Sequence, residues 1–557
     1  MANRKKIMLI FILIVSLQIV NLVFWGYQKP NFFGDEIWSF NFANSSFFPL
    51  MNDAASYQNK WLDNSFWLKA FTVQDSERFN YSSVFYNMTQ DNHPPVYFLI
   101  LHTICSFFPN MLDKWFGIIP NIFFFVFTQV VLLCLSKEMF RTFNYHVLMP
   151  SLIYGFSWGL INNVIYSRMY MLVTLWALLA FYLHVLLYRH IEGNNENKER
   201  LGLWAELSLT VILGILTHFY FLIYETLLSL CFGLYLWNQG KLAGLRKYLL
   251  TLGVAAIASI AIFPSWPSRV LGGGICIPAT AFTNLLKFDL YLRLKAFIKL
   301  LNIDLAGGLL PVIFMMALFL LLTKLTGMFV KLHVTRIGAG YGLDVNFHNP
   351  KSNYHLELEP IFNVWLWGII VCGGYFIIVA KIAPYYESRY MAMLYPLLIL
   401  LGYMMFRFLL SRCFENSKIC LVLAGFFVVL SALLIYRIDN IKFIDKQMLI
   451  VKNLVISKYK DSALISINRG VSWWPEIRNG ELYLNINRSY LAKYDNLTAL
   501  HDDLHDYLGK HDDLLIIVAH ECKDKETNIV NDILEHTNYI PKEKYNLSGD
   551  SLYIFGR

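Results

Sequence analysis

The chain has 557 residues, of which 56% are hydrophobic, 16% aromatic and only 15% charged. Soluble domains carry about 25% charged residues, so this composition is typical of a membrane protein with many spans. It excludes a cytosolic enzyme, a nucleic-acid-binding protein, a coiled coil and a disordered protein as descriptions of the whole chain. The formal net charge of +8 indicates no nucleic-acid partner, because basic residues collect in the cytoplasmic loops of membrane proteins.

The first apolar run follows the basic stretch Arg4-Lys5-Lys6 and extends from Ile7 to about Gly26. Its length matches the roughly 20 residues that cross a bilayer, and no small-residue cleavage site is visible after it. We therefore expect an uncleaved anchor with a cytoplasmic N-terminus. Ten further apolar runs predict an α-helical polytopic membrane protein with about eleven transmembrane helices: 116–136, 146–165, 169–188, 205–219, 220–238, 248–265, 305–323, 361–383, 391–410 and 419–436.

Basic residues between these runs place alternate loops on the cytoplasmic side. Two long hydrophilic parts then lie outside the membrane, a first loop of about 27–115 and the tail from 437. The loop 266–304 is also external in this topology, although it carries several basic residues. Within it, residues 282–301 mix apolar and basic residues as an interfacial helix does. The polar cytoplasmic segment 324–360 has no assigned role.

The chain is thus expected to contain a membrane domain, residues 1–436, and a small extracytoplasmic α/β domain, residues 437–557. The tail has strand-like runs at Ser462–Asn468 and Leu514–His520. Leucines at helical spacing over residues 497–508 predict a helix between the two strands.

The sequence contains few local patterns that are typical of metal sites. The eight cysteines include no close CxxC pair, so a zinc knuckle is not expected. His501 and His505 share one face of the predicted tail helix, which is compatible with a metal ion. The solvated face of an amphipathic helix has the same pattern, and this second interpretation predicts no metal site.

Two adjacent carboxylates open the first external loop, in the stretch Asn31-Phe32-Phe33-Gly34-Asp35-Glu36. Carboxylates near apolar surface are harder to ionise, which suits a general base. The same residues would also cap a helix, because they precede the amphipathic stretch from Ile37 to Phe42. The spacing leaves both interpretations open, and Asp35 and Glu36 are the candidate catalytic residues.

The stretch Asp91-Asn92-His93-Pro94-Pro95-Val96-Tyr97-Phe98 lies later in the same loop. Its double proline predicts an extended entry into a helix that starts at the second proline or just after it. Asp91 and His93 would then lie at the membrane surface, near the first acids. The alternative is a rigid turn with a solvated aspartate.

Three further polar groups fall at expected external helix ends: Ser167-Arg168-Met169-Tyr170, Thr217-His218-Phe219-Tyr220 and Tyr385-Tyr386-Glu387-Ser388-Arg389-Tyr390. Each alone is typical of an interfacial anchor. Together with the acids they bring bases and carboxylates to one membrane face. An arginine there could hold a lipid-linked phosphate by paired hydrogen bonds.

These motifs, in this order, resemble the GT-C membrane glycosyltransferases, and within them the family 39-like group of protein O-mannosyltransferases and bacterial aminoarabinose transferases. The resemblance covers roughly residues 1–410. It implies a sugar donor on a polyprenyl phosphate and transfer with inversion to an extracytoplasmic acceptor, which is a glycan, a lipid or a protein. It implies no nucleotide and no cofactor, and membrane lipids as partners.

The resemblance also implies roles for individual residues. Asp35 would be the general base on the acceptor hydroxyl, and Glu36 and His93 would orient the base or the acceptor. Arg168 and Arg389 would stabilise the charge that develops on the leaving lipid phosphate. The remaining expected site residues position the substrates (Asp91, Tyr97 and His218) or bind the lipid phosphate (Tyr170 and Tyr390).

A polytopic transporter or lipid flippase of a cell-envelope glycan pathway is the alternative. Such proteins carry ionisable residues within their spans and paired broken helices. Here the polar groups are expected at one membrane face, which favours the enzyme. The sequence therefore predicts a multi-pass cell-membrane glycosyltransferase with its first loop and tail outside the cytoplasm.

Overall fold

The computed structural model of the chain describes residues 2–50, 54–193, 201–271, 277–311, 315, 329–337, 340–348, 359–413, 421–423, 425–426, 428–430, 433, 446–470, 473–505, 507, 512–547 and 549–557. Their contacts define two compact units. Unit 1 comprises Met1–Val23, Asn121–Val164 and Met169–Lys442. Unit 2 comprises Phe24–Pro120, Ile165–Arg168 and Phe443–Arg557.

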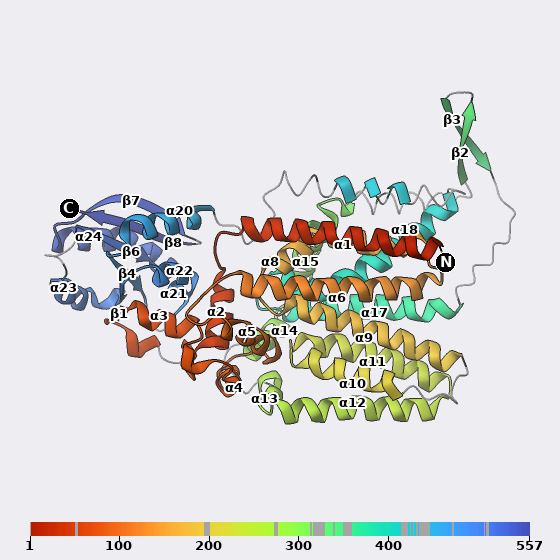
Figure 1. Ribbon diagram of the computed structural model, residues 1–557, viewed down its shortest axis with the longest axis horizontal. Helices are drawn as coiled ribbons and strands as arrows, with labels where there is room; N and C mark the ends of the chain where they lie inside the picture. Colours follow the sequence, from red (N-terminus) through yellow and green to blue (C-terminus); the bar gives the residue numbers. More distant parts are fainter. Residues whose placement is uncertain are drawn as a thin grey trace. The chain divides into compact units, whose positions relative to one another are not determined.

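Unit 1 is built from long helices, which Figure 1 shows as coiled ribbons. Seven described helical segments are long and apolar enough to cross a membrane. They are α1 (Ala2–Gln28), α6 (Trp115–Phe140), α9 (Tyr170–Glu192), α11 (Tyr220–Asn238), α12 (Leu242–Ile262), α17 (Glu359–Ile382), and the 3₁₀ turn η5 (Ser388–Leu394) continued by α18 (Tyr395–Cys413). The first turn of α6 and the last turn of α1 belong to unit 2.

The sequence predicts about eleven spans, whereas seven described segments are long and apolar enough to cross a membrane. The two sets differ at four of the predicted runs. The runs 305–323 and 419–436 lie partly outside the described residues. The run 205–219 forms α10 (Leu201–Ile215), an apolar helix that is shorter than the seven. The run 146–165 is divided into η4 (Tyr145–Leu148), α7 (Met149–Gly155) and α8 (Trp158–Ile165).

The break between α7 and α8 has a local cause. The Ser157 hydroxyl accepts a hydrogen bond from the Leu160 backbone N–H at 3.3 Å, so it caps a new helix. Just before it, a Cβ at Gly155 would lie 2.0 Å from the Gln18 side chain. The glycine therefore gives the Gln18 side chain room to pack against the end of α7.

The remaining elements of unit 1 follow α12. The expected interfacial helix 282–301 is divided between α14 (Ile277–Leu286) and α15 (Leu290–Ala306), which follow the short α13 (Trp266–Leu271). Segment 324–360 contains an antiparallel hairpin of β2 (Phe329–Ile337) and β3 (Gly340–His348).

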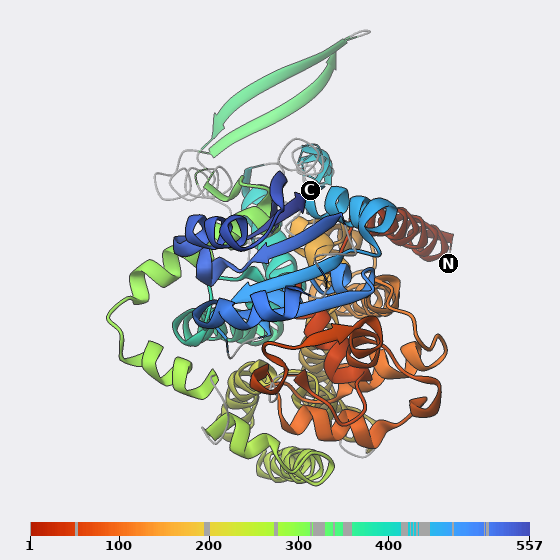
Figure 2. The same cartoon turned by 90° about the vertical axis from the view of Figure 1, so that its left-hand side faces the viewer.

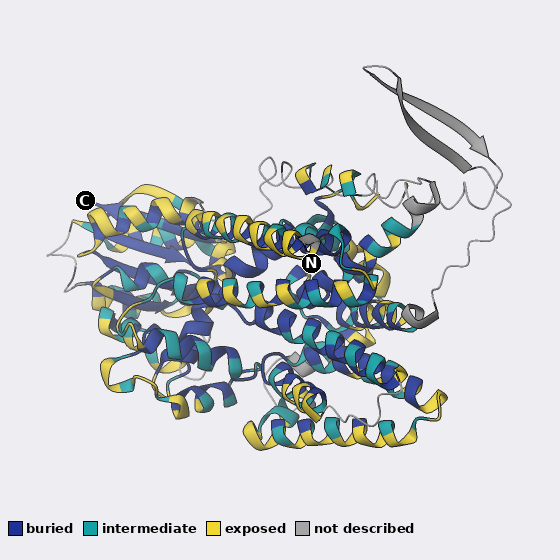
Figure 3. Cartoon of the chain, turned by 45° about the vertical axis from the view of Figure 1, so that its right-hand side comes forward, coloured by how far each residue is buried: buried dark blue, intermediate teal, exposed yellow. Residues whose placement is uncertain are grey.

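Large apolar side chains are exposed along the helices of unit 1. Exposed residues, drawn in yellow in Figure 3, run along several helices. On α12, the exposed side chains include Leu250 at 68%, Val254 at 58% and Ile257 at 70%. Such a surface is unfavourable in water and favourable in lipid. The helices and this surface together make the chain a multi-pass membrane protein.

Unit 2 contains a six-stranded sheet in the order β1-β5-β4-β6-β8-β7, whose strands lie side by side in Figure 2. Five strands come from the tail: β4 (Ala463–Asn468), β5 (Arg488–Lys493), β6 (Asp513–Val518), β7 (Ile540–Leu547) and β8 (Asp550–Gly556). The edge strand β1 (Trp61–Asp63) comes from the first loop and pairs antiparallel with β5. The expected tail strands are confirmed as β4 and β6, and the expected helix as α23 (Leu497–His505).

One face of the sheet holds the apolar core of the tail. In the parallel register, Ile465 lies beside Tyr490 on one side and Ile516 on the other. These three side chains point to the same face and are essentially fully buried. The helices α23 and α24 (Glu526–His536) cover this face through buried leucines and isoleucines at helical spacing: Leu500, Leu504, Ile529 and Ile533.

The opposite face is covered by helices from both parts of unit 2. These are α3 (Asn64–Phe71) from the first loop, and α21 (Trp474–Arg478) and α22 (Gly480–Leu484) from the tail. The Trp67 indole N–H donates to Ser489 Oγ at 2.9 Å, and its ring lies 4.6 Å from that of Tyr483. The first loop therefore contributes both an edge strand and part of the core to this sheet.

The other described helices of unit 2 are α2 (Gly34–Asn44), α4 (Tyr81–Thr89) and α5 (Val96–Ser106) from the first loop, and α20 (Lys446–Leu454) from the tail. The start of α5 directly after Pro95 confirms the predicted helix entry. A Cβ at Gly480 would lie 3.1 Å from Ile37 of α2, so the tail packs closely against this helix.

Glu476 of α21 makes the stability of unit 2 depend on pH. Its Oε1 accepts hydrogen bonds from Ser466 Oγ at 2.6 Å and Asn468 Nδ2 at 3.2 Å, and burial raises its pKa to about 7. The folded state therefore holds this proton more tightly than the unfolded state, whose pKa is about 4.5. Below pH 4.5 the bound proton contributes about 3 kcal/mol to the free energy of unfolding. This contribution is lost as the pH rises from 4.5 to 7.

We expect Glu476→Gln to remove this dependence, because the amide keeps a hydrogen-bond acceptor and carries no charge. The variant should resist heat-induced proteolysis of the tail better than wild type at pH 8, and show little difference at pH 4.5. An equal effect at both pH values would contradict the prediction.

Candidate functional site

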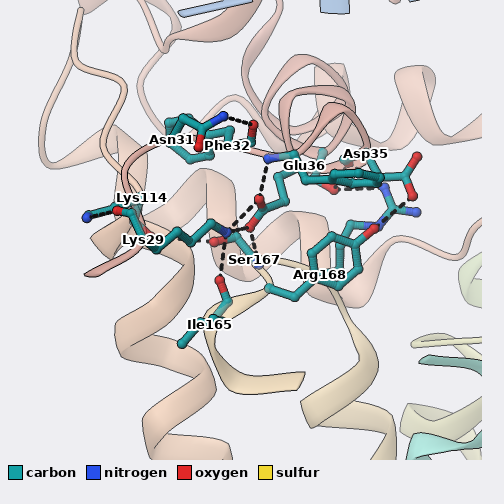
Figure 4. A network of polar contacts seen from close by, with 12 residues as sticks. Lys29, Asn31, Phe32, Asp35, Glu36, Lys114, Ile165, Ser167 and Arg168 are labelled. Carbon is teal, nitrogen blue, oxygen red and sulfur yellow. Dashed lines mark hydrogen bonds and ion pairs between the residues drawn. The ribbon is translucent and has the colours of Figure 1, made fainter. Parts of the chain in front are cut away.

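The first acids lie in the first turn of α2, where Glu36 is fully buried and Asp35 is half-buried. Both carboxylate oxygens of Glu36 lie within hydrogen-bond distance of Lys29 Nζ, at 2.5 and 2.6 Å. Lys29 is also fully buried, and its Nζ donates to the Ile165 carbonyl at 2.7 Å. The adjacent acids therefore have different environments, as Figure 4 shows.

Glu36 holds three segments of the chain together. Besides Lys29, its carboxylate accepts the backbone N–H of Phe33 and that of Ser167, both at 2.6 Å. The first of these bonds closes the N-terminus of α2, so the helix-capping interpretation is correct for Glu36. The second fixes the segment Ile165–Arg168, which belongs to unit 2.

The buried ion pair has an electrostatic cost that its hydrogen bonds offset. Burial lowers the pKa of Lys29, while the facing carboxylates of Glu36 and Glu481 oppose this effect. Two buried charges are tolerated only when each is well satisfied by partners. Here Lys29 has a carboxylate and a carbonyl, and Glu36 has one ammonium and two backbone N–H donors.

Asp35 is held from both its side chain and its backbone. The Tyr166 hydroxyl donates to Asp35 Oδ2 at 2.7 Å. Arg168 Nη1 donates to the Asp35 carbonyl at 2.8 Å and to Ser39 Oγ, one turn along α2, at 2.9 Å. Figure 4 shows Arg168 beside Asp35. These contacts fix the direction of a carboxylate that remains partly open to solvent.

Arg168 continues the network to the second acidic motif. Its Nη2 lies 3.2 Å from His93 Nε2, and His93 Nδ1 lies 2.8 Å from Asp91 Oδ2. A guanidinium only donates, so His93 Nε2 must accept and Nδ1 must carry the hydrogen that Asp91 accepts. This arrangement makes His93 the link between the Arg168 guanidinium and the Asp91 carboxylate.

Asp91 is 7% exposed, so the solvated-aspartate interpretation is wrong. Burial opposes its ionisation, but His93 and Arg168 more than offset this and hold the pKa of Asp91 below its usual value. Tyr97, in the first turn of α5, is 1% exposed, and its hydroxyl has no hydrogen-bond partner among the described residues.

The remaining expected site residues lie in unit 1 and form an aromatic cluster. The Tyr170 ring lies 5.4 Å from that of His218 and 6.5 Å from that of Tyr390. Tyr220 contacts both His218 and Tyr390, with ring centroids at 5.1 and 5.7 Å. The Arg389 guanidinium lies 5.4 Å from the ring centroid of Tyr390.

The structure thus brings together five expected residues in unit 2 and four in unit 1. The unit 2 network contains Asp35, Glu36, Asp91, His93 and Arg168. The unit 1 cluster contains Tyr170, His218, Arg389 and Tyr390. Sequence reasoning missed Lys29, Tyr166 and Ser39, because a lysine and a tyrosine at helix ends have the pattern of ordinary interfacial anchors.

No protein-family profile matches the chain, and a search of curated proteins finds no match. Among solved structures, it is similar to ArnT from Cupriavidus metallidurans bound to undecaprenyl phosphate, at 10% sequence identity and a TM-score of 0.50, over 98% of this chain and 97% of that chain. It is also similar, at 10% identity and a TM-score of 0.38, to an Archaeoglobus fulgidus oligosaccharyltransferase complex with Zn and sulfate, over 83% of this chain and 64% of that chain.

The likeness to ArnT shows the fold. This chain has the same fold as that structure, and its helical spans are followed by a small C-terminal α/β part. The resemblance inferred from the sequence motifs is confirmed at this level.

The Lys29–Glu36 pair yields a stability prediction. Lys29→Met leaves the buried Glu36 carboxylate without its cation, so we expect a loss of about 3–5 kcal/mol from unit 2. The double variant Lys29→Met with Glu36→Gln removes both charges and should recover part of this loss. The measurement is the denaturant concentration at which the first loop of the purified protein becomes protease-sensitive.

Lys60→Met is the matched control, because the Lys60 ammonium makes an exposed contact with the Ser56 carbonyl. It should behave as wild type. If Lys29→Met matches this control, the pair does not stabilise unit 2.

Proposed function

We propose that this chain is an integral-membrane glycosyltransferase that moves a sugar from a polyprenyl-phosphate donor to an extracytoplasmic acceptor hydroxyl, with inversion. Asp35 is the general base in this proposal. The observation that carries it is the half-buried Asp35 carboxylate, held by Tyr166 through its side chain and by Arg168 through its backbone carbonyl. A fixed carboxylate that solvent can reach is the arrangement that a general base requires.

The two adjacent acids divide the work. Glu36 is enclosed by Lys29 and two backbone N–H groups, so it positions α2 and does not meet substrate. Asp35, one residue earlier, points in a different direction and keeps an open side. Asp91 and His93 position Arg168, which in turn positions Asp35.

The reaction follows from these roles. The acceptor hydroxyl gives its proton to Asp35 as its oxygen attacks the anomeric carbon of the donor. The bond between that carbon and the phosphate oxygen breaks, and its electron pair leaves with the lipid phosphate. Attack from the side opposite the leaving group inverts the anomeric centre. The proton on Asp35 then passes to solvent, which restores the base.

The departing phosphate requires positive charge. Arg168 and Arg389 are the proposed cations, with Tyr170 and Tyr390 as further phosphate contacts, and Tyr97 and His218 position the substrates. The ArnT structure with bound undecaprenyl phosphate supports a polyprenyl phosphate as the carrier. The donor sugar and the acceptor are left open, and the proposed reaction uses no cofactor.

Asp35→Asn tests the proposed base. The amide cannot accept the acceptor's proton, so transfer should fall at least about 100-fold while the protein level is unchanged. The experiment compares a deletion strain complemented with wild type, with Asp35→Asn, or with Asp75→Asn. Asp75 is a matched control in the same loop, because its side chain is 73% exposed.

The measurement is mass spectrometry of polyprenyl-phosphate sugars and surface glycans. We expect wild type and Asp75→Asn to restore a glycan that Asp35→Asn does not, and the lipid-linked donor to accumulate with Asp35→Asn. Full restoration by Asp35→Asn would reject the base. A donor that accumulates on the cytoplasmic face only would favour the flippase alternative.

Tyr166→Phe tests whether the orientation of Asp35 matters. Removing the hydroxyl frees the carboxylate to rotate but keeps the base and the ring, so kcat should fall about tenfold with little change in KM. Tyr86→Phe is the control, because Tyr86 is 45% exposed on α4 of the same unit. A change in KM with unchanged kcat would assign Tyr166 to substrate binding instead.

A further inference from the structure

The tail contains a cluster of three side chains of types that can bind metals, and they come from two helices. His501 lies on α23, and Asp532 and His536 lie on α24. The two imidazole rings are stacked, with centroids 4.2 Å apart and planes 22° apart. Asp532 contacts both rings, at 2.8 Å to His501 Nε2 and 3.6 Å from its Oδ1 to His536 Nδ1.

The packing of the two helices fixes this juxtaposition. Leu500 and Leu504 seat α23 in the sheet core, and Ile529 and Ile533 seat α24 in the same core, all at most 1% exposed. His501 follows directly after Leu500, and His536 lies three residues after Ile533. The cluster therefore lies where two rigidly anchored helices meet, and not on a loop.

The geometry matches a first-row metal site. One ligand atom from each of the three residues lies within 4.8 Å of the other two. Zinc binds imidazole nitrogen and carboxylate oxygen at about 2.0–2.2 Å, which places neighbouring ligand atoms about 3.3 Å apart in a tetrahedron. The observed separations, 2.8 Å from Asp532 Oδ2 to His501 Nε2 and 3.6 Å from Asp532 Oδ1 to His536 Nδ1, are close to that value.

The side chains of the cluster have room to rearrange around an ion. His501 Nδ1 is buried with no hydrogen-bond partner among the described residues, whether Nε2 donates to Asp532 or binds an ion. His536 Nδ1 also lies 2.9 Å from the Asp532 carbonyl, within its own helix. Because the His536 side chain is 51% exposed, its ring can turn from that carbonyl toward an ion without disturbing the core.

We propose that His501, Asp532 and His536 bind one divalent transition-metal ion of the zinc class, with water at the remaining position. Two imidazoles and a carboxylate select zinc and its neighbours over calcium or magnesium, which prefer all-oxygen sites. The ion cross-links α23 to α24. The proposal stands apart from the glycosyltransferase proposal, because none of its ligands belongs to the Asp35 network.

The sequence pairs His501 with His505, one turn along the same helix. The proposed ligands are instead His501 and two residues that follow it by 31 and 35 positions, Asp532 and His536. Local spacing cannot identify such a site, because the relation between α23 and α24 depends on the strands between them.

The test uses the purified full-length protein in lipid nanodiscs, stripped with a chelator, dialysed against Zn²⁺ and analysed for bound zinc. Wild type should retain one more equivalent of zinc than His501→Ala, His536→Ala or Asp532→Asn. Loss of a group that only orients a ligand costs about 10- to 100-fold in affinity, so loss of a ligand should weaken zinc binding at least tenfold. Asp532→Asn keeps the shape of the side chain, so it guards against misfolding of the alanine variants.

His520→Ala is the matched control, since His520 lies in the same part of unit 2 and outside the cluster. It should bind zinc as wild type does. Equal zinc retention by wild type and all three ligand variants would overturn the proposal. Equal displacement of the zinc by Ca²⁺ and by Ni²⁺ would also overturn the proposal, because a site with two imidazole ligands binds Ni²⁺ more tightly than Ca²⁺.

Discussion

The contacts of the buried Glu36 carboxylate are the interaction on which the structure of unit 2 depends. It meets the ammonium of Lys29 at the end of the first span and the backbone N–H of Ser167, more than 130 residues later. A buried charge of this kind is stable only if every partner is in place. The end of α1, the start of α2 and the segment Ile165–Arg168 are therefore fixed together.

That constraint explains why two neighbouring acids can behave differently. In an α-helix, successive side chains point in directions about 100° apart. Glu36 points into the protein, and Asp35 is left at the partly open side. The inward residue then anchors the helix, and the outward residue contacts Tyr166 and is only partly buried. Arg168 strengthens this division, because its fixed fork of donors joins the Asp35 backbone to His93.

The sequence predicted the parts that depend on local patterns. The spans, β4, β6 and the helix after Pro95 are visible as apolar runs, alternation and a proline signal. It also identified Asp35, Glu36, His93 and Arg168 as separate candidates. It could not show that Lys29 neutralises Glu36, because a lysine just after a span usually reaches water. Nor could it find β1, whose three residues are too few for a strand pattern.

The strand β1 has a consequence for how the protein is made. It belongs to the first loop, yet it pairs with β5 of the tail, and Trp67 beside it bonds to Ser489, 422 residues later. A ribosome delivers the first loop well before the tail. Until the tail has been made, the first loop therefore has an unpaired strand edge at β1 and a Trp67 side chain without its tail contacts. The sheet of unit 2 can therefore be completed only after the tail has been translated.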